Sequence, residues 1–580
     1  MKLAVRSTSI FLRRISTTTT SRVMANAGSS APGRLEDLTY SNTFQQKLPA
    51  DPNEVNVIRQ VEGAAYSRVA PSPTQGQQAL LCVSRECADL LHLDYAETER
   101  EEFLRAFSGQ DTLEGMDPYA MCYGGHQFGN WAGQLGDGRA IVLGEVQVPA
   151  PSAPSTAKTS SSHTFSPTHR YELQLKGAGK TPYSRRADGR AVLRSSVREF
   201  ICSEAMHALG IPTTRALSLI GTGDLVMRDM FYDGNARVEP GAVVCRVAPS
   251  FIRFGSFELP ASRGDFDLVG KLCRYVSDEL YEGKPVAEWY QTLCERTARM
   301  VVGWQTVGFV HGVMNTDNMS ILGVTIDYGP YGFLEEFDPN FTPNTTDMPG
   351  LRYCFKHQPG VAQWNLAQLA NALLAAEKLT MEEAQAGLTA YTKTMEMEYP
   401  QAMAAKVGVP DADPSLISDL LQIMYDIDMD FTRTFRCLSD VTSSSSSTVG
   451  DRDDDADGVP SVLRAEAPLA YAKETEETKA ARMALGAWVK KYRAACVASG
   501  RSDAERKKSM DSVNPLYIPR NWLAQVAIEA AEKGDYSKIH DLHEVLKRPF
   551  TEQEGKGEYA AVAPAAYATK AGVVRLSCSS

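Results

Sequence analysis

Short apolar runs with period-two alternation dominate the chain between about residues 123 and 247. They predict strands at 140–146, 171–176, 216–228 and 242–247, with glycine-rich turns before the first strand. A helix is predicted at 196–209, ending at Gly210, and after Phe266 the pattern becomes mostly helical. A β-rich half with one prominent helix, followed by a helical half, predicts a two-lobed α+β fold.

Two low-complexity segments divide this pattern. Residues 148–170 are rich in Pro, Ser and Thr and lie between two predicted strands, which predicts an enlarged hairpin loop. Residues 440–460 hold a serine run followed by aspartates but lack the downstream Glu of an EF-hand, which favours a solvated linker over a calcium site. We therefore expect an N-lobe at 31–260, a helical C-lobe at 261–440, a disordered linker at 441–461 and a helical C-terminal extension at 462–580.

Charge and hydropathy narrow the classes of partner. The 580 residues include 60 basic and 71 acidic ones, for a formal net charge of −11, so the chain lacks the basic surface of a nucleic-acid-binding protein. The apolar stretches are broken by Arg, Asp or Glu before they reach the roughly 18 residues that cross a bilayer. We expect neither a nucleic-acid partner nor insertion into a membrane.

The first thirty residues have a distinct composition. They contain five Lys or Arg residues and many Ser and Thr, and the first acidic residue is Glu36. This composition is typical of a mitochondrial transit peptide, which we place at 1–30. The alternative is an unstructured basic tail on a cytosolic protein.

The eleven cysteines form no CxxC pair and have no His at zinc-finger spacing. They therefore predict reduced, mostly buried thiols and no structural metal site. Cys578, third from the C-terminus, is the exception, because a thiol so close to the end is expected to be exposed; the residues alone favour a tail cysteine without a function.

A glycine-rich segment and a strand-end lysine are the first candidates for phosphate binding. Gly136, Gly138 and Arg139 lie directly before the strand at 140–146, although Gly-Asp-Gly is equally typical of an ordinary hairpin turn. Lys176 ends the next strand, and Glu199 lies on the predicted helix, as in the lysine–glutamate ion pair of kinases. The alternative is a surface lysine and a surface glutamate.

A P-loop is excluded in the segment that follows the lysine. Gly179-Lys180-Thr181 matches its end, but the motif needs glycine at the position that Gln174 occupies.

The segment from His311 to Asp327 carries the strongest chemical signature. His311 and Asn318 are seven residues apart, as in the kinase loop H-R-D-x-x-x-x-N, and Asp327-Tyr-Gly follows where kinases have D-F-G. Asn318 and Asp327 are thus candidate ligands of Mg²⁺, since hard oxygen donors suit that ion, and the same ligands accept Mn²⁺.

One position departs from the kinase pattern. The aspartate expected two residues after the His is Val313, which cannot accept a proton. Either the site is inactive or it catalyses a different transfer, and Asp317, directly before Asn318, is a candidate base from a shifted position.

Further charged residues could bind a polyanion. Arg246 ends an apolar strand, Arg253 follows a Pro-Ser break, and a charged cluster before the helix at 196–209 includes Asp188 and Gly189. Arginines gathered in one pocket need a polyanion to neutralise them, and phosphates do so through bidentate hydrogen bonds. Taken singly, each is more often a surface charge.

The chain resembles the selenoprotein O family of protein adenylyltransferases, which have a kinase-like fold. The resemblance rests on four runs within residues 40–370, namely 123–145, 173–212, 246–254 and 311–333, and on 514–522 near the C-terminus. It implies a two-lobed protein-kinase-like fold with family-specific N-terminal and C-terminal extensions. It further implies transfer of AMP from ATP to Ser, Thr or Tyr hydroxyls of proteins, with ATP flipped relative to kinases and pyrophosphate released.

The resemblance also assigns roles to individual residues. Asp317 matches the family's proton acceptor, and Asn318 and Asp327 match its magnesium ligands. Cys578 stands where many eukaryotic members have selenocysteine, which makes it a candidate redox group. The matches to the nucleotide-binding residues are Gly136, Gly138, Arg139, Lys176, Asp188, Gly189, Arg246, Arg253 and Asp327.

Two other functions stay open at this point. A conventional kinase would release ADP and needs a base near the γ-phosphate, which Val313 does not supply. A catalytically silent nucleotide-binding scaffold would not need to retain Lys176, Glu199, Asp317 and Asp327 together. The sequence does not define the oligomeric state or the protein substrates.

Overall fold

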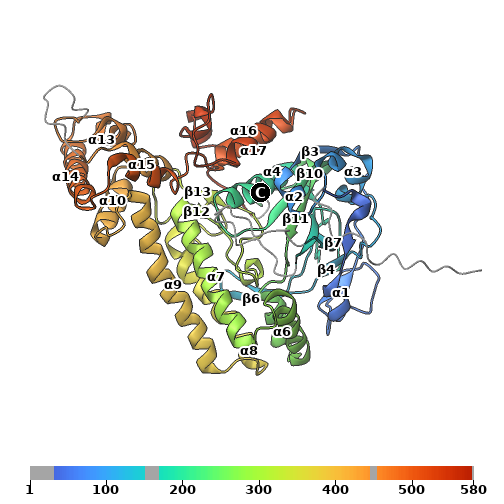
Figure 1. Ribbon diagram of the computed structural model, residues 1–580. Helices are drawn as coiled ribbons and strands as arrows, with labels where there is room; N and C mark the ends of the chain where they lie inside the picture. The colour runs from blue at the N-terminus through green and yellow to red at the C-terminus, as the bar shows by residue number, and fades with distance from the viewer. Residues whose placement is uncertain (1–31, 150–168, 444–453, 578–580) are drawn as a thin grey trace, which may run out of the picture.

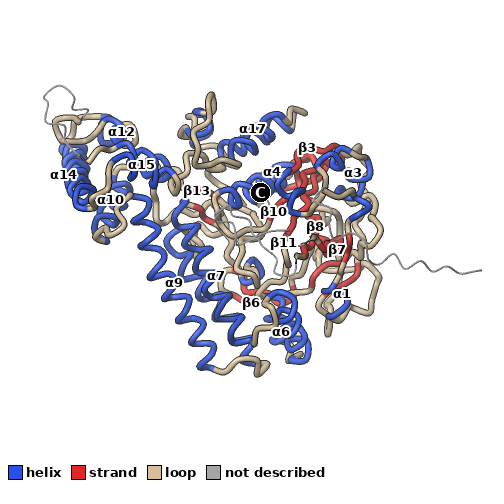
Figure 2. Tube along the Cα trace, viewed as in Figure 1, coloured by secondary structure: helices blue, strands red, loops and turns tan. Residues whose placement is uncertain are grey.

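The computed structural model describes residues 32–149, 169–443 and 454–577 (Figure 1). A β-rich lobe and a helical lobe lie side by side, and the strands gather almost entirely in the first of them (Figure 2). This arrangement confirms the predicted two-lobed α+β fold.

The N-lobe is built on a nine-stranded sheet. Its strands follow the order β2-β4-β7-β8-β11-β10-β3, with β1 paired to β7 and β9 paired to β11, and every pair is antiparallel. The strands are β1 (Thr39–Tyr40), β2 (Tyr66–Arg68), β3 (Ala79–Val83), β4 (Tyr119–Met121), β7 (Ala140–Gln147), β8 (Arg170–Lys176), β9 (Ala191–Val192), β10 (Arg215–Arg228) and β11 (Arg237–Ala248).

Two smaller sheets complete the β structure. The hairpin of β5 (Gly124–Gln127) and β6 (Asn130–Gln134) leads into β7, and β12 (Phe309–Val310) pairs with β13 (Gly332–Phe333) in the helical lobe.

All four predicted strands are present. The structure has them as β7, β8, β10 and β11, each differing from its predicted bounds by no more than a few residues except β11, which begins earlier. β7 and β8 pair antiparallel with Gln147 opposite Arg170, so the segment between them joins the two strands of a hairpin as predicted. Both faces of β8 are buried: Leu173 and Leu175 pack in the apolar core, whereas Glu172 and Gln174 face polar partners.

Helices cover the two faces of the sheet. α2 (Arg85–Leu90) and α3 (Glu101–Ser108) pack against one face, sharing a core with strands β7, β8 and β11. α4 (Leu193–Ala208), predicted at 196–209, packs against β10 and β11 on the other face. The short helix α1 (Thr43–Lys47) places Phe44 in the core that the two lobes share.

The helical lobe forms around α7 and α9. α9 begins with a capping box between Thr380 and Glu383 and ends at Gly408, whose φ of 72° suits glycine. Its apolar residues pack against those of α7 and α8 in one continuous core. The helices of the lobe are α5 (Gly255–Ser262), α6 (Phe266–Leu280), α7 (Val286–Val307), α8 (Gln358–Ala375), α9 (Met381–Val407), α10 (Pro414–Asp426) and α11 (Phe431–Cys437).

The C-terminal extension divides into two parts that pack in different places (Figure 1). The first part extends the helical lobe, where Trp488 and Tyr492 join the core of α10 and α11. The second returns to the N-lobe, where Trp522 and Leu542 share a core with α4 and β10. The helices are α12 (Ser461–Arg464), α13 (Pro468–Ala472), α14 (Glu476–Ala498), α15 (Asp503–Asp511), α16 (Asn521–Ala531), α17 (Ser537–Leu546) and α18 (Ala565–Ala568).

Two expectations about domain limits need correction. Residues 454–461, predicted to be part of a disordered linker, pack on α14: Asp454 pairs with Arg493 at 2.6 Å, Asp457 pairs with Arg482 at 3.0 Å, and Val459 is fully buried. The linker aspartates thus neutralise arginines of a later helix. The lobe boundary predicted at residue 260 falls inside α5, whose Phe257 belongs to the core that the two lobes share.

No helix within the described residues is long and apolar enough to cross a membrane. The predicted transit peptide at 1–30 and the thiol of Cys578 lie outside the described residues. The ten described cysteines are all free, and all but Cys437 are buried, in keeping with reduced thiols.

Candidate active site

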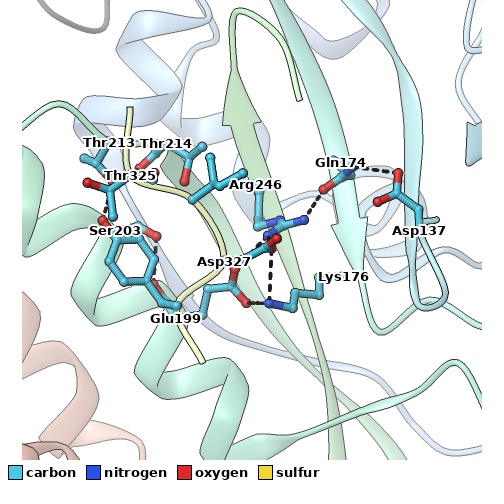
Figure 3. A network of polar contacts seen from close by, with 12 residues as sticks. Asp137, Gln174, Lys176, Glu199, Ser203, Thr213, Thr214, Arg246, Thr325 and Asp327 are labelled. Carbon is cyan, nitrogen blue, oxygen red and sulfur yellow. Dashed lines mark hydrogen bonds and ion pairs between the residues drawn. The ribbon is translucent and has the colours of Figure 1, made fainter. Parts of the chain in front are cut away.

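The Lys176 ammonium and the Glu199 carboxylate form an ion pair between the sheet and α4, with Nζ and Oε2 2.6 Å apart (Figure 3). Lys176 is the last residue of β8, and Glu199 lies in the second turn of α4, which packs across the sheet. Both side chains are largely buried. Burial lowers the pKa of Lys176, and the Glu199 charge opposes that shift.

Arg246 links this ion pair to Asp327, which follows the kinase-like loop at 311–318. It lies on β11 and donates to Glu199 Oε1 at 2.9 Å, to Asp327 Oδ1 and to Gln174 Oε1. Its side chain is only 1% exposed, so three acceptors neutralise and orient a guanidinium that has left water. Its Nε–H is buried with no acceptor among the described residues.

Arg253 approaches Asp327 from the other side. It donates to Asp327 Oδ2 and, at 2.7 Å, to the backbone carbonyl of Asp317. Like Arg246, it buries an Nε–H that has no acceptor within the described part of the chain. Three cationic side chains thus converge on one carboxylate in a buried site, an arrangement that fits a polyanionic ligand.

Asp327 itself has an uncommon backbone conformation, with φ at +59°. Burial opposes its ionisation, but Arg253, Arg246 and Lys176 hold its pKa well below the usual range. Asp327 is therefore an anion whose carboxylate is fixed from two sides.

A second layer of polar groups positions the arginines. Gln174 accepts from Arg246 and donates to Asp137 Oδ2 at 3.4 Å (Figure 3). Asp137 Oδ1 lies 3.8 Å from Arg253 NH2. Asp137 also accepts from the Met121 backbone N–H at 3.1 Å, and burial raises its pKa. Gln174 and Asp137 are site residues that the sequence motifs do not identify. The available signals were the place of Gln174 on the polar face of β8 and the place of Asp137 between two glycines.

The glycine-rich segment connects the β5–β6 hairpin to β7, so Gly136-Asp137-Gly138 is not the hairpin turn considered above. Gly136 has a φ of 77°, and a Cβ there would lie 2.4 Å from Tyr183 Cγ. A Cβ on Gly138 would lie 3.0 Å from the Tyr183 carbonyl oxygen. Arg139 directly precedes Ala140, the residue of β7 that pairs with Lys176. Burial is the main cause of the lowered pKa of Lys176, and the charge of Arg139 adds to it.

Gly189 and Asp188, in the loop before α4, have different surroundings: Gly189 is buried, whereas Asp188 is exposed. Gly189 packs against the segment that follows Lys176, and its carbonyl accepts from the Gly179 N–H at 3.0 Å. A Cβ on Gly189 would lie 2.2 Å from Gly179, so glycine is required by contact as well as by its φ of 74°. Asp188 is exposed and pairs with Arg228 at 2.7 Å, so it is not part of the buried network around Asp327.

His311 joins the two ends of the segment at 311–327 through hydrogen bonds. Its Nε2 bonds to the Ile326 carbonyl at 2.9 Å, and its Nδ1 accepts from the Val313 N–H at 3.4 Å. Burial lowers its pKa, and these two bonds fit the neutral ring with the proton on Nε2. His311 is therefore a positioning group next to Asp327, and the Val313 side chain is buried.

Asp317 and Asn318 lie together in the 3₁₀ turn η3 (Thr316–Asn318). Asp317 is 8% exposed, and burial raises its pKa to about 7, although Arg253 and a hydrogen bond from Gln127 oppose the shift. A carboxylate with a pKa near neutrality is suited to accept a proton. Asn318 donates through Nδ2 to the Val313 carbonyl at 2.9 Å, which leaves Oδ1 as the amide atom able to bind a cation.

The oxygen atoms of Asn318 and Asp327 are too few to hold a metal by themselves, but they fit a cation that is bound together with a nucleotide. No group of three or more His, Cys, Asp or Glu able to hold a metal occurs among the described residues. Asn318 and Asp327 are two candidate oxygen ligands on neighbouring loops. Mg²⁺ is commonly held in this way, by few protein ligands together with phosphate oxygens and water.

The two lobes and the Lys176–Glu199 pair, with Asn318 and Asp327 on neighbouring loops, are the arrangement of a kinase-like enzyme, a class that transfers part of a nucleotide. The sequence profile of the family "Protein adenylyltransferase SelO" matches residues 54–547. The chain therefore belongs to the SelO family of protein adenylyltransferases, in agreement with the resemblance noted from its motifs.

Similar proteins from bacteria extend this finding. The protein nucleotidyltransferase YdiU of Azoarcus sp. strain BH72 is 49% identical over 558 residues, which cover 94% of this chain and all of that protein. YdiU of Xanthomonas campestris pv. campestris strain B100 is 50% identical, covering 94% of this chain and 99% of that protein. YdiU of Aromatoleum aromaticum is 47% identical, with 94% and 100% covered. The chain is thus an enzyme of the nucleotidyltransferase class.

Proposed function

We propose that this enzyme transfers AMP from ATP to Ser, Thr or Tyr hydroxyls of proteins, with the nucleotide reversed relative to kinases. Family membership supplies protein AMP transfer, and the orientation of ATP and the residue roles are our inference. One observation carries the proposal: Lys176, Arg246 and Arg253 converge on Asp327, while Val313 stands where a kinase has its base.

The two buried arginines support a reversed nucleotide. In a kinase with ATP in the usual orientation, the strand lysine pairs with the α- and β-phosphates and the γ-phosphate faces the acceptor. Here Arg246 and Arg253 add two buried guanidinium groups that both contact Asp327, each with a buried Nε–H that could donate to a phosphate. We place the β- and γ-phosphates against these groups and Lys176, which brings the α-phosphate towards Asp317.

The chemical step then balances as a nucleotidyl transfer. The acceptor hydroxyl gives its proton to the Asp317 carboxylate as its oxygen bonds to the α-phosphorus. The bond from the α-phosphorus to the bridging oxygen breaks, and pyrophosphate leaves with the electron pair. Arg246 and Arg253 neutralise charge on the leaving group.

Asn318 and Asp327 would hold Mg²⁺, or Mn²⁺, which would neutralise phosphate charge when bound. Gly136, Gly138 and Arg139 would lie along the nucleotide as a glycine-rich loop, and Gly189 would support the strand end that carries Lys176. Asp188 would reach the nucleotide only from the exposed edge of the site, since it pairs with Arg228 there.

Product analysis tests this function. Full-length protein is incubated with ATP, Mg²⁺ and a mixture of acceptor proteins, and intact-mass spectrometry separates added AMP from added phosphate. The proposal predicts added AMP and released pyrophosphate. Added phosphate with released ADP would favour a kinase, and nucleotide binding without either product would favour a silent scaffold.

We also propose that residues 1–30 direct the chain to mitochondria, since they are basic and lack acidic residues. Fusion of these residues to a fluorescent protein tests this, and diffuse cytosolic fluorescence would contradict it. Cys578 is proposed as a redox-active thiol, and its accessibility to an alkylating reagent in the folded protein is the first measurement.

A further inference from the structure

The β5–β6 hairpin lies directly on the turn that carries Asp317. The His126 backbone N–H donates to Thr316 Oγ1 at 2.7 Å, and the Phe128 N–H donates to Asn315 Oδ1 at 3.1 Å. Phe128 has a φ of 50°, in the left-handed region that residues other than glycine seldom adopt. The hairpin and the loop are therefore held in register over consecutive residues.

Between these two backbone contacts, a side chain of the hairpin reaches Asp317. Gln127 donates from Nε2 to Asp317 Oδ2 at 3.3 Å. Because the residues on either side of Gln127 are held by their own backbone bonds, the glutamine side chain approaches Asp317 from a fixed position. The side-chain torsions of Gln127 are then what remains to be ordered for this contact.

The two carboxylate oxygens of Asp317 have different surroundings. Oδ2 accepts from Gln127, whereas Oδ1 is buried and has no hydrogen-bond partner among the described residues. A Cβ on Gly125 would lie 2.7 Å from Oδ1, so the absence of a side chain there keeps the space beside this oxygen free. A buried acceptor oxygen without a donor is uncommon and fits a site where a ligand supplies the donor.

We propose that Gln127 is a positioning residue for AMP transfer: it holds Asp317 through Oδ2 so that Oδ1 receives the proton of the acceptor hydroxyl. This inference rests on the role of Asp317 in the proposed function. Gln127 binds neither the nucleotide nor the acceptor in this account, and it acts only through the carboxylate. The hairpin thus contributes to the acceptor side of the reaction, not to ATP binding.

The test compares three full-length variants in AMP transfer from α-labelled ATP to a protein acceptor. Gln127→Ala removes the donor, and Gln127→Glu keeps the side-chain length but replaces the amide donor with a carboxylate. Asn130→Ala is the matched control, because Asn130 is an exposed amide on the same hairpin; among the described residues, its side chain bonds only to the Phe128 carbonyl, at 3.3 Å. ATP affinity is measured separately for each variant.

We expect kcat to fall about 10- to 100-fold in both Gln127 variants while the Kd for ATP stays within about twofold, since misplacing a reacting group has costs of this size. Asn130→Ala should retain kcat. In an Asp317→Ala background, Gln127→Ala should lower the residual rate by less than about twofold, because residues that act as a unit are non-additive.

Four results would overturn the inference: an unchanged kcat in Gln127→Ala, an unchanged kcat in Gln127→Glu, a parallel loss of ATP affinity, or an equal loss in Asn130→Ala. If wild-type protein transfers no AMP, the proposed function itself fails. If wild type transfers AMP and the Gln127 variants match it, only the positioning role fails.

Discussion

Arg253 joins Asp327 to Asp317: its guanidinium donates to the Asp327 carboxylate and, at 2.7 Å, to the backbone carbonyl of Asp317. One buried side chain thereby sets the distance between a candidate metal ligand and the candidate base. We therefore expect Arg253 to set the geometry of Asp317 and Asp327 in addition to adding positive charge to the site.

Replacing Arg253 by Lys tests that geometry. Lysine keeps the charge but cannot form several directed hydrogen bonds in one plane, so kcat/KM should fall by about 100-fold even though the net charge is the same. Steady-state AMP transfer measures the effect. The control is Arg263→Lys, at an exposed arginine after α5. Equal activity of Arg253→Lys and wild type would mean that only the charge matters.

Glu199→Gln should destabilise the empty protein more than the nucleotide-bound one. Glu199 separates Lys176 from Arg246, and removing its charge leaves two buried cations, at a cost of about 3 kcal/mol in the free energy of unfolding. ATP brings compensating negative charge, so the melting temperature of the variant should rise more on ATP addition than that of wild type.

Glu288→Gln, at an exposed position of α7, controls for loss of one surface charge. If ATP raised the melting temperatures of Glu199→Gln and wild type equally, the phosphates would not lie near this ion pair.

Glu204 predicts a pH dependence of stability. It lies on α4, buried against Arg215 at 2.7 Å; burial opposes its ionisation, but Arg215 and Ser84 hold its pKa at about 2 instead of 4.5. Because the folded-state pKa is depressed, this stabilisation is complete above about pH 4.5 and is lost as the pH falls through about 2, and it amounts to about 3 kcal/mol.

The Glu204→Gln variant should therefore unfold at lower denaturant concentration than wild type near neutral pH, and the difference should shrink towards about pH 3. Chemical denaturation at several pH values measures both curves. A difference that stays constant with pH would show that Glu204 stabilises α4 through packing and not through its charge.

Removal of divalent cations should stop AMP transfer, and Asn318 should set the concentration that restores it. Asn318→Ala removes one of two protein oxygen donors, so the Mg²⁺ concentration for half-maximal transfer should rise about 10- to 100-fold. Titration of Mg²⁺ into EDTA-treated enzyme gives this value, and Asn340→Ala is a control outside the turn. An unchanged Mg²⁺ requirement in Asn318→Ala would exclude it as a ligand.

Much of the local structure could be predicted because its signals are local. The strands β7, β8, β10 and β11 and helix α4 follow from apolar periodicity, and the Lys176–Glu199 pair follows from its position on a strand and a helix. The segment 311–327 could be located because His311, Asn318 and Asp327 lie close together in the sequence, in the order and spacing of kinase motifs.

The rest depends on contacts between distant segments. The pairing of Gln127 with Asp317 joins residues 190 positions apart, and no periodicity indicates it. The return of α16 and α17 to cover α4, and the packing of Asp454 and Asp457 on α14, likewise arise from tertiary partners. Composition alone predicted a disordered linker there because it does not show which arginines will neutralise the aspartates.

The most direct test of the central claim follows the two ends of the triphosphate. Full-length wild type, Asp327→Ala and the exposed control Asp233→Ala are incubated with Mg²⁺, a protein acceptor, and ATP labelled on either the α- or the γ-phosphate. We expect protein-bound α-label, no protein-bound γ-label, and loss of transfer only in Asp327→Ala. Protein-bound γ-label without α-label in the wild type would contradict AMP transfer and identify the enzyme as a kinase.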